Sequence, residues 1–330
     1  MYNMDKLFDA VAKRGPVCVG LDTAVEYVPP RERRRMVSDA EAVLAFNKAI
    51  IDTTIDACAC YKVQIAYYEE MGLAGLKAYA ATLAYLRDRG ALAIADIKRG
   101  DIADTASRYA KAHLDGEFEA DFVTLAPYMG MDSVEPWLAY VRSKGKGAFV
   151  LMRTSNPGMR DFEYRRLAEG GYVYDAVGDK LQDLSASLLG ERGYGAVGAV
   201  VGCTEQEEAA DIRKKRDNIF FLIPGYGAQG GAAADAARLL RLGNGGVVNA
   251  SRSILKAWTA TSPGEAVQPP VGGASFAGEA TLAQAASAAR RATEEMRDSI
   301  RAACEAGAAC AAGAACEAGT GRKTDTVGAR

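Results

Sequence analysis

The chain has 330 residues, of which 49% are hydrophobic and 25% are charged, so its composition is that of a globular protein long enough to bury a large core. Its formal net charge of -2 gives no support for binding to nucleic acid or to an anionic membrane, because both attract basic surfaces. No apolar run reaches the roughly 20 residues of a membrane helix. We therefore expect a cytoplasmic protein that works on a small molecule.

The residue types that usually carry nucleophilic or metal chemistry are scarce or poorly spaced. His113 is the only histidine, which argues against a Ser-His-Asp triad and against a metal site built from several histidines. The seven cysteines are an odd number, and residues 1–15 predict an amphipathic helix rather than a signal peptide. We expect free thiols, no disulfide framework and no bound metal.

Eight short apolar runs predict buried strands, because nearly continuous hydrophobicity is typical of strands that are covered on both faces. In chain order they are PVCVGLD, CYKVQIA, ALAIAD, DFVTLAP, GAFVLMR, GAVGAVVG, IFFLIPG and GGVVNAS, from residue 16 to residue 251. Helical spacing of apolar residues lies between them, as in residues 37–57 and 71–89. The alternation predicts either a (β/α)8 TIM barrel or an open doubly wound sheet.

Polar residues at the ends of the predicted strands favour the barrel. Chemistry in barrel enzymes collects at the C-terminal ends of the strands. Polar and turn residues lie at or just past these ends at Asp22, Asp96, Lys98, Ser155, Pro224, Gly225, Ser251 and Arg252. We therefore predict one catalytic barrel domain over residues 1–258.

The pattern changes after residue 258. A linker rich in proline and glycine leads to a helix over residues 281–303, with Leu282, Ala285, Ala289, Met296 and Ile300 near one face. We assign residues 259–303 to this linker and C-terminal helix. The low-complexity repeat ACEAGA, ACAAGA, ACEAGT then begins a tail over residues 304–330, for which disorder or a frayed helix is expected.

The segment ADIKRGDIADT (residues 95–105) holds the pattern D-x-K-x-x-D at the end of the third predicted strand. Alternation along a strand sends Asp96 and Lys98 to the same side. Facing the barrel mouth, this pair would lie in a shielded cavity where charges interact more strongly than in water. A surface charge cluster in a loop is the alternative.

Lys62 strengthens the first interpretation, because a lysine among the apolar residues of a strand costs desolvation unless it meets a carboxylate. Its strand would neighbour those that carry Asp22 and Asp96, so the three would form an alternating chain of acids and bases. Lys62 could instead extend its ammonium group to solvent.

Three later segments suit a phosphate and a polar ring. The glycine-rich IPGYGAQGG, which holds Gln229, has the features of a mobile lid. NASRSI places Ser251 and Arg252 where backbone N–H groups and a guanidinium suit a phosphate. RTSNPG places Ser155 at the mouth, although a plain turn is an equally good interpretation.

Together these segments resemble the orotidine 5′-monophosphate decarboxylase family, in its longer bacterial branch. The resemblance covers residues 19–254 and is carried, in order, by VGLDT, YKVQIAYYE, ADIKRGDIADT, APYMG, RTSNPG, IPGYGAQGG and NASRSI. The family implies cofactor-free decarboxylation of orotidine 5′-monophosphate to UMP and carbon dioxide in pyrimidine synthesis.

The resemblance also implies residue roles. Lys62, Asp96, Lys98 and Asp101 would form the charged catalytic network, with Asp101 entering the active site of the partner subunit in a homodimer. Substrate contacts would come from Asp22, Ile102, Thr105, Ser155, Pro224, Gln229, Ser251 and Arg252. Among these, Ile102 and Thr105 would cross to the partner, Asp22 and Lys62 would hold the ribose, Ser155 the pyrimidine, and Gln229 and Arg252 the phosphate.

Two rival interpretations remain. A sibling in the same superfamily, a sugar-phosphate decarboxylase or aldolase, would use a similar D-x-K-x-x-D pattern with magnesium, although RTSNPG and the Gln229 loop argue against it. A catalytically silent nucleotide-binding barrel, or a scaffold acting through the tail, belongs to a different class because fold alone does not fix function.

Overall fold

Eight parallel strands close into a barrel in which each strand pairs with the next and β8 pairs with β1. The computed structural model describes residues 1–205, 207–227, 230–259 and 280–320. The strands are β1 Val17–Gly20, β2 Cys60–Gln64, β3 Ala93–Arg99, β4 Phe122–Leu125, β5 Gly147–Arg153, β6 Val197–Val201, β7 Phe221–Ile223 and β8 Gly246–Ala250. Seven of them lie within their predicted runs, and β3 extends past its run as far as Arg99; the closed barrel is therefore confirmed and the open sheet is rejected.

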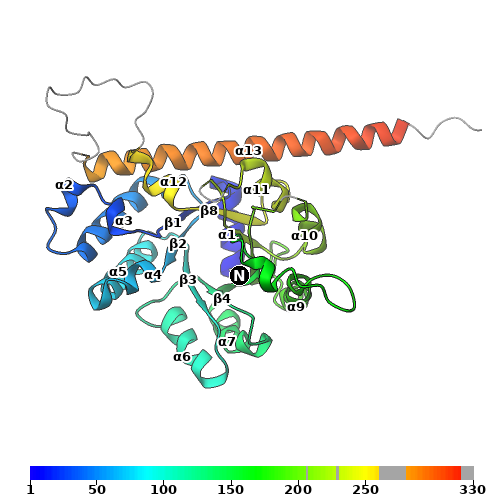
Figure 1. The fold of residues 1–330 in the computed structure, drawn as a ribbon, viewed down its shortest axis with the longest axis horizontal. Helices are drawn as coiled ribbons and strands as arrows, with labels where there is room; N and C mark the ends of the chain where they lie inside the picture. The colour runs from blue at the N-terminus through cyan, green and yellow to red at the C-terminus, as the bar shows by residue number, and fades with distance from the viewer. Residues whose placement is uncertain (206, 228–229, 260–279, 321–330) are drawn as a thin grey trace, which may run out of the picture.

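Helices surround the strands as an outer layer (Figure 1). They are α1 Asn3–Arg14, α2 Pro30–Arg33, α3 Asp39–Thr54, α4 Ala66–Glu69, α5 Gly72–Asp88, α6 Ala103–Leu114, α7 Glu135–Lys144, α8 Met159–Phe162, α9 Val173–Ser187, α10 Ala209–Lys215, α11 Ala233–Leu239, α12 Arg252–Leu255 and α13 Leu282–Thr320. Short 3-10 turns are η1 Val25–Tyr27, η2 Met131–Ser133 and η3 Ala257–Thr259. The two helices predicted over residues 37–57 and 71–89 correspond to α3 and α5. No helix in these described ranges is long and apolar enough to span a membrane.

Local signals explain where several helices begin and end. The Ser38 side chain accepts a hydrogen bond from the Glu41 N–H at 3.2 Å, which satisfies one of the free N–H groups in the first turn of α3. Helix α7 has a proline in its first turn and ends at Gly145, whose left-handed backbone (φ 68°) suits a residue without a Cβ atom.

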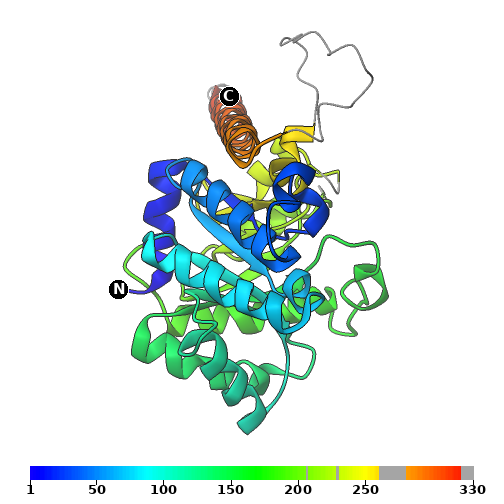
Figure 2. The ribbon, with the colours of Figure 1, turned by 90° about the vertical axis from the view of Figure 1, so that its left-hand side faces the viewer.

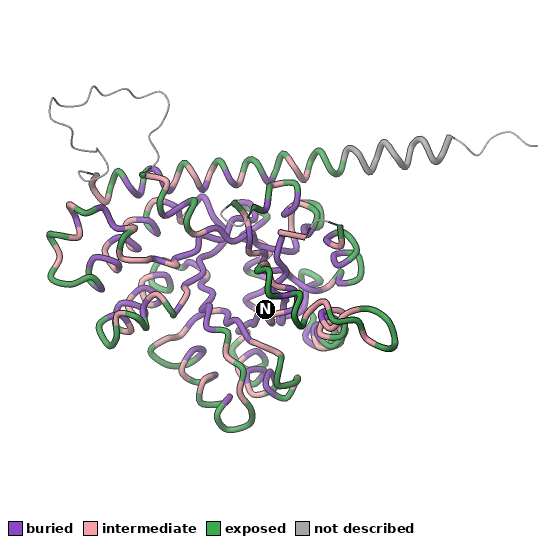
Figure 3. The backbone as a smooth tube through the Cα atoms, in the orientation of Figure 1, coloured by how far each residue is buried: buried purple, intermediate pink, exposed green. Residues whose placement is uncertain are grey.

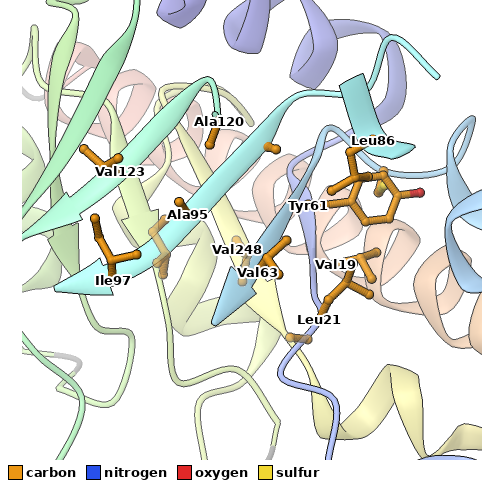
Figure 4. Packing of buried hydrophobic residues seen from close by; sticks show 14 of the residues in the cluster. Val19, Leu21, Tyr61, Val63, Leu86, Ala95, Ile97, Ala120, Val123 and Val248 are labelled. Carbon is orange, nitrogen blue, oxygen red and sulfur yellow. The ribbon is translucent and has the colours of Figure 1, made fainter. Parts of the chain in front are cut away.

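Side chains on alternating faces of the strands build two apolar layers. The outward side chains Val19, Val63 and Ala95 pack under the helices, and Figure 4 shows this layer from close by. The inward side chains at the N-terminal end of the barrel include Phe122 and Phe149, and α1 covers them with a face that includes Leu7. Burial is accordingly concentrated in the strands and the inner helix faces (Figure 3). Because apolar side chains fill the N-terminal end of the barrel, the charged residues predicted from the sequence lie at the C-terminal end.

Helix α13, which corresponds to the predicted C-terminal helix, completes the ring of helices around the barrel. It packs between α3 and α11, and the views in Figures 1 and 2 show it along one side of the barrel. The predicted apolar face is buried at Ala285, Ala289, Met296 and Ile300. The helix continues to Thr320, beyond the expected end at residue 303. The linker residues 260–279 and the tail residues 321–330 lie outside the described residues.

Candidate active site

A cavity of 530 Å³ opens at the C-terminal end of the barrel. Its walls come from β2 to β8 and from the loops that follow several strands of the barrel, including β1. The lining residues are Asp22, Tyr27, Lys62, Gln64, Tyr67, Asp96, Lys98, Thr124, Leu151, Thr154, Ser155, Asn156, Val200, Leu222, Pro224, Gly225, Tyr226, Asn249, Ala250, Ser251 and Arg252. Eight of the twelve residues proposed from the sequence thus face one cavity.

The predicted chain of acids and bases lies on one wall of this cavity. The Lys62 ammonium is 2.6 Å from Asp22 Oδ1 and 3.1 Å from Asp96 Oδ2. The Lys98 Nζ atom is 2.7 Å from Asp96 Oδ1. The Lys62 side chain is only 5% exposed, so it does not extend to solvent, whereas the Lys98 side chain is 47% exposed and reaches the open cavity.

Four donors surround the Asp96 carboxylate. Lys62 and Lys98 bring positive charge, Thr124 Oγ1 donates at 2.8 Å, and Gln64 Nε2 donates at 2.9 Å. Burial opposes ionisation of Asp96, but the two ammonium charges and the hydrogen bonds outweigh it and hold the pKa of Asp96 well below its usual value. The cavity therefore presents a buried carboxylate that stays ionised throughout the physiological pH range.

The buried ammonium of Lys62 is stabilised in the same way. Burial lowers its pKa, but the carboxylates of Asp22 and Asp96 raise it by more, so Lys62 stays protonated. Asp22 also accepts a hydrogen bond from Ser251 Oγ at 2.8 Å. This contact depends on Gly20, because a Cβ atom at that position would lie 2.0 Å from Ser251 Oγ.

The loops after β5 to β8 form the rest of the cavity wall. Ser155 lies at the cavity beside Gly202, where a Cβ atom would come within 2.8 Å of the Ser155 Cβ. The preceding residue is held in place because Glu163 accepts hydrogen bonds from both the backbone N–H and the hydroxyl of Thr154 at 2.8 Å. Pro224, Ser251 and Arg252 line the same cavity, while Gln229 lies outside the described residues.

Three of the predicted residues do not line the cavity of their own chain. Asp101, Ile102 and Thr105 lie where β3 leads into α6, and Asp101 Oδ1 accepts the N–H of Ile102 at 2.8 Å. Ile102 is 44% exposed, which is high for an isoleucine. The geometry of a single chain thus leaves these three side chains available to something outside it.

Several polar residues of the cavity were not predicted from the sequence, and three of them have notable hydrogen bonding. Gln64 and Thr124 both donate to Asp96, and the Oδ1 atom of Asn249 is buried without a hydrogen-bond partner among the described residues. Gln64 follows Lys62 by two positions and so shares its face, which was a usable signal. Thr124 had none, because threonine is an ordinary strand residue.

The comparisons with known proteins agree with this geometry. Residues 15–267 match the family described as "Orotidine 5'-phosphate decarboxylase / HUMPS family". The orotidine 5′-phosphate decarboxylase of Clostridium perfringens (strain SM101 / Type A) is 58% identical over 256 residues, which are 78% of this chain and 89% of that protein. That of Clostridium acetobutylicum is 56% identical over 264 residues, covering 80% of this chain and 92% of the relative.

Solved structures of the same family share the fold of this chain. The structure of Leishmania donovani OMP decarboxylase superposes with a TM-score of 0.67 at 29% sequence identity, covering 92% of this chain and 98% of that one. Fold, cavity and relatives are thus consistent with one another. The chain belongs to the orotidine 5′-phosphate decarboxylase family.

Proposed function

We propose that this chain performs the reaction of its family, the decarboxylation of orotidine 5′-monophosphate to UMP and carbon dioxide, with Asp96 and Lys98 at the reacting carbon. The observation that carries the proposal is the ionised Asp96 carboxylate, buried at the cavity wall with Lys98 Nζ 2.7 Å away. Such fixed charges cost no reorganisation when charge develops in a transition state.

The two charges act on different stages of the reaction. With the substrate carboxylate beside Asp96, two negative charges lie close together, and the loss of carbon dioxide relieves their repulsion. The bond between ring carbon 6 and the carboxylate breaks, and its electron pair stays on carbon 6. The Lys98 ammonium stabilises this pair and then transfers a proton to it, and the exposed side chain regains a proton from water.

Binding of the rest of the substrate supports this chemistry, because contacts remote from the reacting atoms can hold the ring in place against the repulsion. We assign the ribose hydroxyls to Asp22 and Lys62, and the pyrimidine edge to Ser155. Arg252 and Gln229 would take the phosphate, with Pro224 and Ser251 beside them. The chemistry proposed here uses the charges of the chain itself and needs no metal ion or organic cofactor.

We further propose a homodimer in which Asp101, Ile102 and Thr105 enter the partner's active site. Their absence from the cavity of their own chain and the exposure of Ile102 support this assignment. Further large apolar side chains are exposed at the same end of the barrel, on the loops after β4 and β5: Tyr128 (88%), Met129 (49%) and Phe162 (66%). Exposed apolar surface of this kind is typical of a contact with another chain.

Mixed dimers test the shared site and the reaction together. A chain with Lys98→Ala and a chain with Asp101→Ala should each be inactive alone. When the two are co-expressed, half of the dimers are mixed, and each mixed dimer has one site with Lys98 from one chain and Asp101 from the other. UMP formation should then recover to about a quarter of the wild-type rate.

Failure to recover activity, with mass spectrometry showing that mixed dimers are present, would contradict the shared site. Activity in the Asp101→Ala chain alone would contradict the role of Asp101. The cytoplasmic location and the absence of nucleic-acid and membrane partners stay predictions from the sequence.

A further inference from the structure

The last part of β3 does not follow regular strand geometry. Ala95 pairs with Val123 of β4, but the next pair joins Arg99 to Leu125, so residues 96–98 of β3 lie opposite the single residue Thr124. Within this irregular stretch the backbone of Lys98 has φ 42°, in the left-handed region that non-glycine residues seldom adopt. The two residues with the central roles in the proposed reaction, Asp96 and Lys98, are therefore held by a β-bulge.

The Thr124 hydroxyl takes the place of the missing strand-to-strand hydrogen bonds. Its Oγ1 atom accepts the backbone N–H of Ile97 at 3.0 Å and that of Lys98 at 2.9 Å. The same hydroxyl donates to Asp96 Oδ1 at 2.8 Å. Because a hydroxyl has one donor and two acceptor positions, these three bonds use its full capacity and fix its orientation.

We propose that Thr124 is a positioning residue for the decarboxylation. Its hydroxyl fixes the bulge at the end of β3 and, through the same bonds, sets the distance between the Asp96 carboxylate and the Lys98 ammonium. The proposal rests on the roles proposed above for Asp96 and Lys98. Thr124 is 1% exposed and acts through these two residues.

The three bonds link the backbone to the charges. Without the hydroxyl, the N–H groups of Ile97 and Lys98 would lose their acceptor, which favours a different backbone path. The strained φ of Lys98 would then be able to relax, and its Nζ atom would move away from Asp96. Asp96 would also lose one of the four donors that fix the orientation of its carboxylate.

The expected kinetic signature follows from which contacts are disturbed. A misplacement of about 1 Å in a reacting group costs on the order of 100-fold in rate. Within the described part of the chain, the Thr124 hydroxyl bonds to Asp96, Ile97 and Lys98 and forms no hydrogen bond with Asp22 or Arg252. The loss should therefore fall on kcat, with KM changed by less than about three-fold.

The test compares Thr124→Val, which keeps the shape and removes the hydroxyl, with Thr124→Ser, which keeps the hydroxyl. Thr293→Val is a matched control, since Thr293 is fully buried and its hydroxyl bonds only a backbone carbonyl within α13. We expect kcat to fall on the order of 100-fold in Thr124→Val. Thr124→Ser should stay within about five-fold of wild type, and Thr293→Val should change Tm alone.

A kcat in folded Thr124→Val within about three-fold of wild type would overturn the proposal, and so would an equal loss in Thr124→Ser. Lys98→Ala, measured in parallel, separates the two levels. An active Lys98→Ala would contradict the role proposed for Lys98, on which the positioning role depends, whereas an inactive Lys98→Ala beside a normal Thr124→Val would contradict only the positioning role. If Thr124→Val does not fold, Thr124→Ala provides the same test with a smaller side chain that is easier to accommodate in the core. We expect it to lose at least about ten-fold in kcat.

Discussion

The same strand faces carry apolar side chains at one end of the barrel and charged or polar ones at the other. On β2, β3 and β4 the inward residues Cys60, Ile94 and Phe122 belong to the apolar layer under α1. Two positions further along each strand, the inward residues are Lys62, Asp96 and Thr124, which line the cavity. The residues that stabilise the fold and the residues proposed to perform the chemistry thus occupy adjacent layers inside the barrel.

The difference shows how the fold tolerates a buried cluster of charge. Taking an ammonium and two carboxylates out of water costs free energy that their mutual attraction only partly returns. The closely packed aromatic layer below, where the Phe122 and Phe149 rings lie 5.4 Å apart, contributes free energy that offsets this cost. We therefore expect changes at the two ends to separate activity from stability.

The largest effect should come from Lys98→Ala at the charged end. Removing the proton donor and the charge that stabilises carbon 6 should lower kcat by at least about 10⁴-fold. The fold should persist because the Lys98 side chain is half exposed and Lys62 still pairs with Asp96. Steady-state assays measure kcat, and circular dichroism checks the fold. The control is Lys77→Ala, which removes an exposed lysine on α5. Substantial residual turnover would disprove the assigned role.

The reverse outcome is expected at the apolar end. Phe149→Ala removes a fully buried ring and should lower the free energy of unfolding by about 3–5 kcal/mol. The kcat of the folded enzyme should stay within about two-fold of wild type, because the cavity layer above keeps its contacts. Urea unfolding and assays at low temperature measure the two quantities. A large loss of kcat would show that the two layers are coupled.

A smaller effect concerns His113, which lies on α6 and is 3% exposed. Burial lowers its pKa from 6.5 to about 4, so the unfolded chain binds a proton here more readily than the folded one. Stability from this group is present above pH 6.5 and is lost as the pH falls toward 4, by roughly 2 kcal/mol at pH 5. The test measures the free energy of unfolding of wild type and of His113→Leu at pH 7 and at pH 5. Wild type should lose more stability between the two pH values than His113→Leu does. An equal pH dependence in both chains would rule it out.

The smallest effect should follow deletion of residues 304–330. The buried face of α13 ends near Ile300, so the truncated chain keeps the packing that completes the barrel. We expect kcat/KM and Tm close to wild type. A marked loss of either would show that the tail has a structural role.

The sequence was sufficient to predict the strands and the ion chain from local periodicity, and the polar residues at the strand ends favoured the barrel over the open sheet. Continuous apolar runs gave all eight strands, and alternation with strand order put Lys62 between Asp22 and Asp96. These inferences need only neighbours along the chain and the rule that consecutive strands pair.

The features that were missed depend on register and distant packing. The bulge that places Thr124 opposite residues 96–98 arises from how β3 and β4 align, which neither strand encodes alone. Helix α13 was treated as an addition because a long linker separates it from β8, yet it packs between α3 and α11. Whether Asp101 serves a second chain is likewise a property of two molecules, which is why it is proposed here on exposure and tested by mixed dimers.

The most direct test of the central claim is the incubation of the purified wild-type chain with orotidine 5′-monophosphate in the presence of a metal chelator. Carbon dioxide and UMP should appear in equal amounts, at the same rate as without the chelator. Loss of activity on chelation would point to the magnesium-dependent sibling chemistry. Absence of both products, with and without chelator, would contradict the assignment of the charged cavity to this reaction.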